Sequence, residues 1–203
     1  MITERRSDPA LHLLQPVRMM TNVAGKSPSE QDESRFTLKD GRTVFLRSIR
    51  HTDGDLLVEM FKKMSSQSLF LRFMWRISAL PEDMVYRLTH VDYQKEYALV
   101  AVTPEEGKEA IIAVGRYAYD PGEDITDLAV AVRDDWQDLG IGKSLLAMTV
   151  AVARANGISH FRSMMSAENR RMKRILSELG YDVKYSWRSG FLEVDIISTQ
   201  TGK

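Results

Sequence analysis

The sequence predicts an α/β protein in which helices flank a central mixed, mostly antiparallel sheet. Runs of apolar and β-branched residues indicate strands, and segments with apolar residues three or four apart indicate helices. The two kinds of segment are interspersed along the chain. In a chain of 203 residues, 43% hydrophobic residues supply enough apolar surface for one domain with a sizeable core.

The first 35 residues differ from the rest of the chain. They carry mixed charges, include the polar stretch "GKSPSEQDESR", and show no sustained apolar period. A segment of this composition buries too little apolar surface to hold one structure. We therefore expect a flexible arm over residues 1–35 and a single domain over residues 36–203.

The domain is predicted to begin with one strand and three helices. The run "TVFLRSI" at 43–49 favours a strand. In 53–64 the apolar residues have the spacing of one helical face, and "SSQSLFLRFMW" at 65–75 predicts a second helix. Pro81 suits the start of a helix and predicts a third one through "PEDMVYRLTH".

Three strands joined by tight turns follow. They are predicted at 96–102, 109–119 and 125–132, with Gly107 and Gly122 in the turns between them. Short connections of this kind join antiparallel neighbours. The middle of the chain is therefore predicted to form most of the sheet.

Helices and strands alternate in the last third of the chain. A helix at 140–156 carries its apolar residues on one side and ends at Asn156-Gly157. A strand at 160–166 and a helix at 168–180 follow. The paired strands "YDVKYSW" and "GFLEVDII" complete the predicted fold.

The composition argues against several classes of function. The 28 basic and 28 acidic residues give a formal net charge of zero, so nothing favours nucleic acid or an anionic membrane as a partner. Without cysteine there is no disulfide framework, thiolate zinc site or cysteine nucleophile, and the four scattered histidines predict no metal site. The stretch "ALHLLQPVRMM" is too short to cross a membrane, and the cytoplasm is the predicted location.

The stretch "DDWQDLGIGKSLL" at 134–146 carries the strongest functional signal. Two glycines stand where a helix begins, and the free N–H groups of a first helical turn favour an anion. The glycine-rich loop that binds nucleoside triphosphates is excluded because the position of its first glycine holds Gln137 here. The dinucleotide-binding fingerprint is excluded because the position of its third glycine holds Leu145. The remaining pattern, Q-x-x-G-x-G, has the form of a loop that binds the diphosphate of coenzyme A.

Residues 35–197 resemble the GNAT superfamily of N-acetyltransferases, whose signature Q/R-x-x-G-x-G/A is "QDLGIG" here. The segments "SSQSLFLRFM", "LTHVDYQKEYALVAV" and "SAENRRMKRILSELGYDV" narrow the resemblance to the GNAT domain of bacterial protein-lysine acetyltransferases of the Pat type. Many Pat proteins carry a further large domain, so this chain is similar to a stand-alone version. The resemblance implies the GNAT acyltransferase fold, acetyl-CoA as acyl donor and a protein lysine as acceptor.

The resemblance also implies which residues hold the donor. Main-chain groups of Val130, Ala131 and Val132 would contact the pantetheine arm. The loop and the first turn of the following helix would hold the diphosphate. This part of the predicted site consists of Gln137, Asp138, Leu139, Gly140, Ile141, Gly142, Lys143 and Ser144. Asn169 matches a family asparagine that contacts the cofactor, and capping of the last helix is its competing role.

A base is needed because a free lysine has a pKa of about 10.4 and attacks only as the neutral amine. Simple alternation along 125–132 places Asp127 on one face with Ala129 and Ala131, beside small side chains. By resemblance Asp127 takes the position of a catalytic glutamate, and its shorter side chain favours contact through a bridging water. Glu96 is the second candidate, with a salt bridge to an arginine as its competing role.

The proton donor to the leaving thiolate is less well marked. Many GNAT enzymes place a tyrosine in the last helix, where this chain has Leu176. Either the thiolate leaves without help from the protein, or Ser177 or a water supplies the proton.

Three interpretations of the activity stay open. Since no cysteine can carry an acyl group, we expect direct attack of the amine in a ternary complex. The acceptor could also be a small-molecule amine or a protein N-terminus. A catalytically silent acyl-CoA-binding sensor is the alternative from another class. A homodimer is compatible with the sequence.

Overall fold

The computed structural model of the 203-residue chain describes residues 34–93 and 95–198. The arm predicted over residues 1–35 lies outside the described residues, apart from Ser34 and Arg35. These two residues belong to the first strand, so regular structure begins slightly before the predicted domain boundary.

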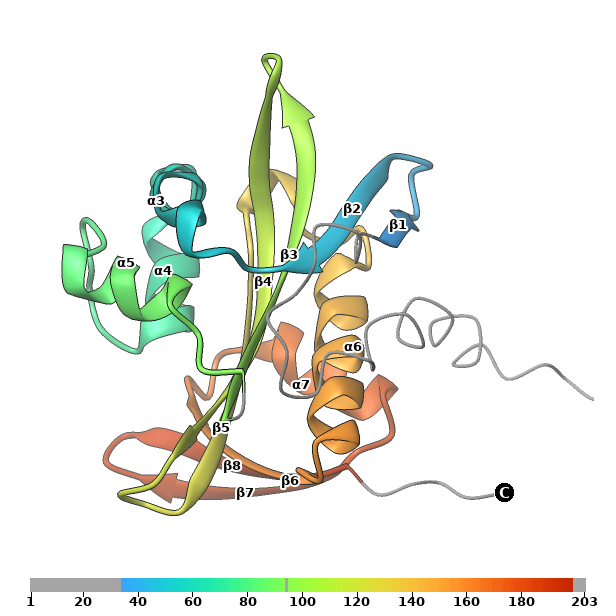
Figure 1. The fold of residues 1–203 in the computed structure, drawn as a ribbon. Helices are drawn as coiled ribbons and strands as arrows, with labels where there is room; N and C mark the ends of the chain where they lie inside the picture. The colour runs from blue at the N-terminus through green and yellow to red at the C-terminus, as the bar shows by residue number, and fades with distance from the viewer. Residues whose placement is uncertain (1–33, 94, 199–203) are drawn as a thin grey trace, which may run out of the picture.

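A five-stranded antiparallel sheet forms the centre of the fold, with the strands in the order β1-β2-β3-β4-β5. The strands are β1 (Ser34–Thr37), β2 (Thr43–Ser48), β3 (Glu96–Glu105), β4 (Lys108–Asp120) and β5 (Ile125–Val132). The hairpin of β3 and β4 projects beyond the helices, toward the top of Figure 1. Its turn is Glu106-Gly107, and both of these residues have positive φ.

A second antiparallel sheet has three strands in the order β6-β8-β7. The strands are β6 (His160–Met165), β7 (Asp182–Arg188) and β8 (Phe191–Ile197). No ladder joins the two sheets within the described part of the chain. Instead, the hydroxyl of Ser163 on β6 donates to the carbonyl of Leu128 on β5 at 2.9 Å and accepts from its amide at 3.0 Å.

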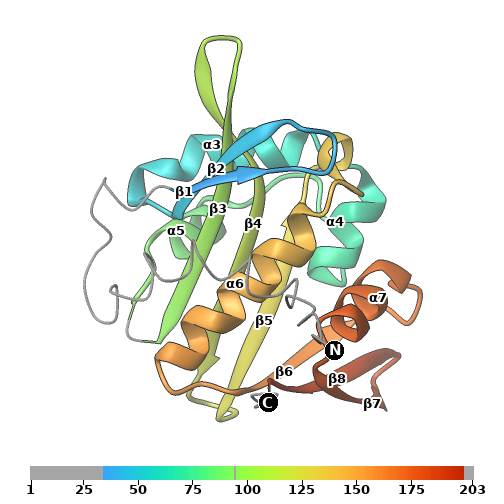
Figure 2. The same cartoon turned by 90° about the vertical axis from the view of Figure 1, so that its right-hand side faces the viewer.

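Helices cover both faces of the larger sheet. They are α3 (Gly54–Lys62), α4 (Ser66–Phe73), α5 (Glu82–Thr89), α6 (Ile141–Ala155) and α7 (Arg170–Glu178). Figures 1 and 2 show α3, α4 and α5 on one face of the sheet and α6 on the other. The buried side chains accordingly form two clusters, one around Leu57 and Met60 of α3 and one around Leu145 of α6 and Leu176 of α7.

Strand β5 alternates between these two clusters. Ala131 belongs to the cluster beneath α3, whereas Leu128 and Val132 pack on the α6 side. Because β5 pairs with β4 without a shift of register, Asp127 shares the face of Ala131, as alternation predicts. The register shift of this sheet lies between β3 and β4.

The predicted α/β architecture with mostly antiparallel strands is confirmed, with two differences. The sequence does not predict β1, because "SRFT" is short and largely polar and forms a strand by pairing with β2. The chain also forms two sheets where one is predicted. Separation of the sheets depends on contacts between β5 and β6, which lie on either side of α6 in the sequence.

Candidate active site

One edge of strand β5 faces the second sheet without forming a ladder with it. Main-chain N–H and C=O groups of β5 point to this edge. In an antiparallel pair, alternate residues direct both N–H and C=O to the same neighbour. The amide of Arg133 donates to the carbonyl of Ile112 on β4 at 2.9 Å, in register with the strand pairs. Ala131 therefore also faces β4, and Val130 and Val132 direct their N–H and C=O groups away from it.

These directions distinguish the three residues predicted to make main-chain contacts. The N–H and C=O groups of Val130 both point to the edge of β5 that faces the second sheet. The carbonyl of Val132 accepts a hydrogen bond from Nε2 of Gln137 at 3.0 Å, which leaves the Val132 amide for a ligand. Ala131 lines the adjacent cavity, but its N–H and C=O belong to the pairing with β4. A ligand along β5 can therefore bond the main chain at Val130 and Val132 and touch Ala131 by packing.

Helix α6 begins with a set of unpaired amides. Its N-cap, Gly140, has a φ of 90°, and no side chain caps this end. None of the amides from Asp138 to Lys143 donates to an acceptor among the described residues. A helix of 15 residues adds the positive end of its dipole. Such amides can bind the oxygens of a diphosphate.

A cavity of about 590 Å³ lies along this turn, β5 and α7, and we call it the loop cavity. The predicted loop residues that line it are Gln137, Asp138, Gly140, Ile141, Gly142 and Lys143. Leu139 and Ser144 do not. Leu139 packs against the core, and the buried hydroxyl of Ser144 donates to the carbonyl of Gly140 at 3.2 Å. Leu139 can take part in a ligand site only through its amide, whereas the amide of Ser144 also donates to the carbonyl of Gly140, at 3.1 Å, and Ser144 serves to hold the turn.

Several charged side chains at the rim of the loop cavity pair with one another. Nζ of Lys143 lies 3.0 Å from Glu178, and Arg171 lies 2.8 Å from Asp138. The hydrogen bond from Lys143 holds the pKa of the Glu178 carboxyl below its usual value. Ion pairs between exposed side chains are weak, so an incoming diphosphate can compete for these cations.

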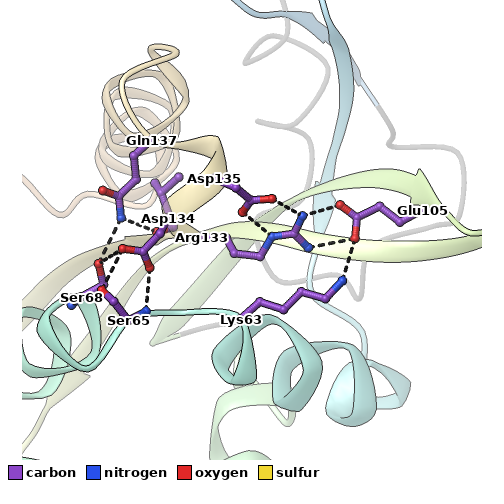
Figure 3. A network of polar contacts seen from close by, with 9 residues as sticks. Lys63, Ser65, Ser68, Glu105, Arg133, Asp134, Asp135 and Gln137 are labelled. Carbon is purple, nitrogen blue, oxygen red and sulfur yellow. Dashed lines mark hydrogen bonds and ion pairs between the residues drawn. The ribbon is translucent and has the colours of Figure 1, made fainter.

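Gln137 links the turn to α4, as Figure 3 shows. Its Nε2 donates to the hydroxyl of Ser68 at 3.2 Å and to Val132, and its Oε1 accepts from Arg171. Both polar atoms of the side chain already have partners in the protein. The side chain of Gln137 therefore positions the turn, and only its main chain is suited to contact a ligand.

Asp134 makes a second link to the same helix. Its carboxylate accepts from the amide and the hydroxyl of Ser65 and from the hydroxyl of Ser68, each at 2.8 Å. Partial burial acts to raise the pKa of Asp134, but these hydrogen bonds outweigh it and keep the pKa below its usual value. The N-terminus of α4 is thus tied to the segment that leads into the amide turn.

Arg133 anchors that segment from the other side. Its buried guanidinium pairs with Glu105 of β3 and lies 2.7 Å from Asp135. Glu105 also lies 3.0 Å from Nζ of Lys63, which follows α3. The hydrogen bond from Arg133, the largest cause, lowers the pKa of Glu105 to about 2. The hairpin, α3 and the turn are therefore joined by one charged network.

A second cavity, of about 380 Å³, lies between β5, the second sheet and α7, and we call it the Asp127 cavity. The exposed carboxylate of Asp127 lines it. Glu96 lines neither cavity and lies 3.1 Å from Arg116, which is the salt bridge named as its competing role. Both carboxylates stand opposite Ala118, on either side of β4, so they are two strand spacings, about 10 Å, apart.

The two cavities meet. The residues that line both are Leu71, Arg72, Val130, Asn169 and Met172. The side chain of Asn169 caps α7 by accepting from the amide of Met172 at 3.1 Å, which leaves its own NH2 group for a ligand. The capping role and a ligand contact are compatible at this position.

The protein group predicted as a possible proton donor, Ser177, is poorly placed, and Leu176 occupies the position of the family tyrosine. Leu176 is buried and lines the Asp127 cavity, whereas Ser177 is exposed and lines neither cavity. Among the described residues that line the two cavities there is no tyrosine and no histidine. Sequence reasoning missed Arg72 and Ser68, because their parts in the site depend on contacts between α4 and distant segments.

Comparison with known proteins identifies the family. Residues 64–181 match the family model described as Acetyltransferase (GNAT) family. The chain belongs to the GNAT family. Acetyltransferase PA5475 of Pseudomonas aeruginosa is 32% identical over 168 residues, which cover 80% of this chain and 90% of that protein. Acetyltransferase Pat of Mycolicibacterium smegmatis is 26% identical over 145 residues, and the match covers 70% of this chain and 42% of Pat.

Solved structures show the same GNAT fold. The GNAT domain of S. lividans PAT is 28% identical, with a TM-score of 0.73 over 83% of this chain and 98% of that one. The structure of yncA from Salmonella typhimurium with its cofactor acetyl-CoA has a TM-score of 0.59 at 16% identity, over 79% and 96% of the two chains. The protein is thus a GNAT acetyltransferase that uses acetyl-CoA.

The GNAT chain has features that suit this donor. The unpaired amides from Asp138 to Lys143 match the negative charge of the diphosphate. A Cβ at Gly142 would lie 3.3 Å from Cγ2 of Val132, so glycine keeps the turn close to β5. When bound, acetyl-CoA supplies the activated thioester.

The described residues of this GNAT protein contain neither a candidate metal site nor a candidate membrane span. No group of three or more histidine, aspartate or glutamate side chains there could hold a metal ion. None of the helices in that part of the chain is both long and apolar enough to span a membrane.

Proposed function

We propose that this GNAT acetyltransferase transfers the acetyl group of acetyl-CoA to the side-chain amine of a protein lysine, with Asp127 as the base. The observation that carries the proposal is the meeting of the two cavities at Val130. A donor held by the amide turn reaches that junction along β5, and Asp127 faces an acceptor from the other cavity.

The proposed binding roles follow the directions of the protein groups. The amides from Asp138 to Lys143 hold the diphosphate, and Lys143 adds charge. The main-chain groups of Val130 and the amide of Val132 bond the pantetheine arm. The amide of Val130 is also suited to donate to the carbonyl oxygen of the thioester, where negative charge develops. Asn169 donates through its NH2 group.

The proposed reaction has two protons and one electron pair to place. Asp127, directly or through a water, takes the first proton from the ammonium of the acceptor and later returns it to solvent. The neutral nitrogen attacks the carbonyl carbon, so that a C–N bond forms, the C–S bond breaks and its electron pair leaves on sulfur. The nitrogen loses its second proton to water as the amide forms. Because the sequence contains no cysteine, a cysteine-bound acyl intermediate is excluded.

Two observations support a protein lysine as the acceptor. The sequence resembles Pat-type protein-lysine acetyltransferases, and its match to Pat covers 70% of the chain. In addition, the Asp127 cavity is lined by residues from the tips of the β4–β5 and β7–β8 hairpins, including Glu123 and Arg188, whose side chains lie 4.0 Å apart. Figure 1 shows these tips together at the lower left, where a lysine on another protein could enter. Action in the cytoplasm is part of the proposal.

The test is an assay of thiol release and acetyl-lysine formation with acetyl-CoA and a panel of lysine-bearing proteins. We expect acetyl-lysine on at least one protein and its loss in Asp127→Asn. Turnover with small amines or N-termini alone would refute the protein lysine, and binding of acetyl-CoA without any turnover would favour the sensor. Size-exclusion chromatography with light scattering checks the homodimer separately.

A further inference from the structure

The junction of the two cavities contains one cation whose charge is not balanced by a close partner. Arg72 stands in the last turn of α4, is half-buried and lines both cavities. No hydrogen bond or ion pair within 4.0 Å joins its guanidinium to another described residue. The ring of Phe73 lies 5.1 Å from it. The group is therefore held by packing, and its N–H donors have no acceptor among the residues that the structure describes.

The other arginines that line the cavities differ in this respect. Each of them has a carboxylate partner within 4.0 Å: Arg162 with Asp195, Arg171 and Arg174 with Asp138, and Arg188 with Glu123 and Glu193. Since a guanidinium that is partly shielded from solvent normally pairs with a carboxylate, the exception at Arg72 favours an anion that a ligand supplies.

The two charges that act on Arg72 come from β5 and β4. Asp127 of β5 attracts the guanidinium and Arg116 of β4 repels it, while Glu96 of β3 pairs with Arg116. Burial, the largest cause, lowers the pKa of Arg72, and Asp127 opposes this shift. A guanidinium stays protonated at neutral pH even so. The junction therefore keeps a positive charge beside the carboxylate that receives the proton.

Acetyl transfer creates one new anion at this place. When the C–S bond breaks, its electron pair leaves on the sulfur of coenzyme A. Neither Leu176 nor Ser177 can donate a proton to it, since Leu176 is apolar and Ser177 lines neither cavity. Asn169 can offer a neutral N–H, but a charged donor binds an anion more strongly.

We propose that Arg72 is a further catalytic residue, which stabilises the thiolate of coenzyme A as it leaves and makes a protein proton donor unnecessary at that step. The inference rests on the proposed reaction but requires no particular acceptor. It assigns to one arginine the work that a tyrosine in the last helix performs in many GNAT enzymes. The thiolate then takes its proton from solvent after release.

The test measures how pH changes the affinity of coenzyme A relative to desulfo-coenzyme A, which lacks the thiol, by isothermal titration calorimetry. The thiol of free cysteine has a pKa of about 8.5, and the alkyl thiol of coenzyme A, which is a weaker acid, is likewise protonated at neutral pH. If Arg72 stabilises the thiolate, the bound thiol has a lower pKa, and the affinity ratio rises with pH up to the pKa of the free thiol. We expect this rise in the wild type and in Arg72→Lys.

The neutral variants Arg72→Met and Arg72→Gln should lose the rise. Removal of a cation a few ångströms away is expected to raise the pKa of the bound thiol by about 1–3. Arg87→Met is the matched control, because Arg87 lies on the exposed face of α5 and lines neither cavity. Two neutral variants are included in case one fails to fold, and circular dichroism checks each of them.

The possible outcomes distinguish the role of Arg72 from the proposed acetyl transfer. The same pH dependence in the wild type and the neutral variants would overturn the role of Arg72 and leave the proposed acetyl transfer intact. Failure of both ligands to bind the wild type would overturn the donor site and the role of Arg72 together. Loss of the rise in the neutral variants, with the control unchanged, supports the role.

Discussion

Asp127 and Glu96 show that the position of a carboxylate decides which one can act as a base. Both begin strands of the same sheet and both stand opposite Ala118. Glu96 lies against Arg116 at 3.1 Å and lines neither cavity, whereas Asp127 is exposed in the Asp127 cavity. A carboxylate can remove a proton only where the acceptor reaches it.

We therefore expect Asp127→Asn to lower kcat near neutral pH by about 10²–10⁴-fold, which is the usual contribution of a general base. The affinity for acetyl-CoA should change little, because Asp127 does not line the loop cavity. Stopped assays of thiol release and calorimetry with acetyl-CoA measure the two quantities. Glu96→Gln is the matched variant and should keep most of its turnover. The opposite ranking of the two variants would transfer the role to Glu96.

Gln137 shows that a residue at a motif position need not contact the ligand with its side chain. The signature predicts this residue in the donor site, but its side-chain amide bonds Ser68, Val132 and Arg171. Its contribution is to hold the turn in place. Sequence spacing specifies the turn, and the partners of the side chain come from α4 and α7.

The link between α4 and the amide turn is the main coupling between elements in the site. Ser65 caps α4 by accepting from the amide of Ser68 at 3.2 Å, and Asp134 holds this serine by accepting from its amide and hydroxyl. The same helix carries Leu71 and Arg72 into both cavities. The position of the junction side chains therefore depends on a residue outside either cavity.

Asp134→Ala should lower the free energy of unfolding by about 0.5–2 kcal/mol, because Ser65, which caps α4, and Ser68 lose their hydrogen bonds to the carboxylate. It should also weaken the binding of acetyl-CoA, because α4 is no longer held against the turn. Urea unfolding and calorimetry provide the two measurements. Asp55→Ala, at an exposed position of α3, is the control. An unchanged affinity in a folded Asp134→Ala protein would show that the link has no effect on the site.

Strand β5 shows how much of the site can be predicted from an element alone. Alternation predicts that Asp127 shares a face with Ala131, and the pairing with β4 confirms it. Alternation also gives opposite directions to the main-chain groups of neighbouring residues, which separates Ala131 from Val130 and Val132. The sequence does not reveal which of the two sets faces the second sheet, since that depends on how β4 pairs.

On the scale of the whole molecule, the sequence predicts the elements better than their assembly. The strand at 125–132 and the helix that opens at Gly140 have strong local signals, namely apolar runs and glycines. The separation into two sheets has no local signal, because it depends on how two strands that are distant in the sequence meet. Between them, hydrogen bonds that join the side chain of Ser163 and the main chain of Leu128 take the place of a ladder. The sequence also does not predict the Arg133 network, because the network joins β3, α3 and the turn, which are far apart in the sequence.

The Arg133 network predicts how stability depends on pH. Its hydrogen bonds lower the pKa of Glu105 from 4.5 to about 2 in the folded protein. A pKa that is lower in the folded state stabilises the fold above the unfolded value, and the stabilisation is lost as pH falls from about 4.5 toward 2. Between these values, the stability advantage of the wild type over Glu105→Gln should shrink in urea unfolding at several pH values. Glu82→Gln, in the exposed first turn of α5, is the control. A constant difference between wild type and Glu105→Gln across this pH range would contradict the network.

We propose that the amide turn at the start of α6 holds the diphosphate of acetyl-CoA, and the roles proposed for the other site residues depend on this contact. Its most direct test is calorimetric titration of acetyl-CoA into the wild type and Gly142→Glu, with circular dichroism to check the fold. The substitution places bulk 3.3 Å from Val132 and a negative charge among the unpaired amides. We predict one binding site in the wild type and none in the folded variant. Binding of equal strength in both proteins would contradict the claim.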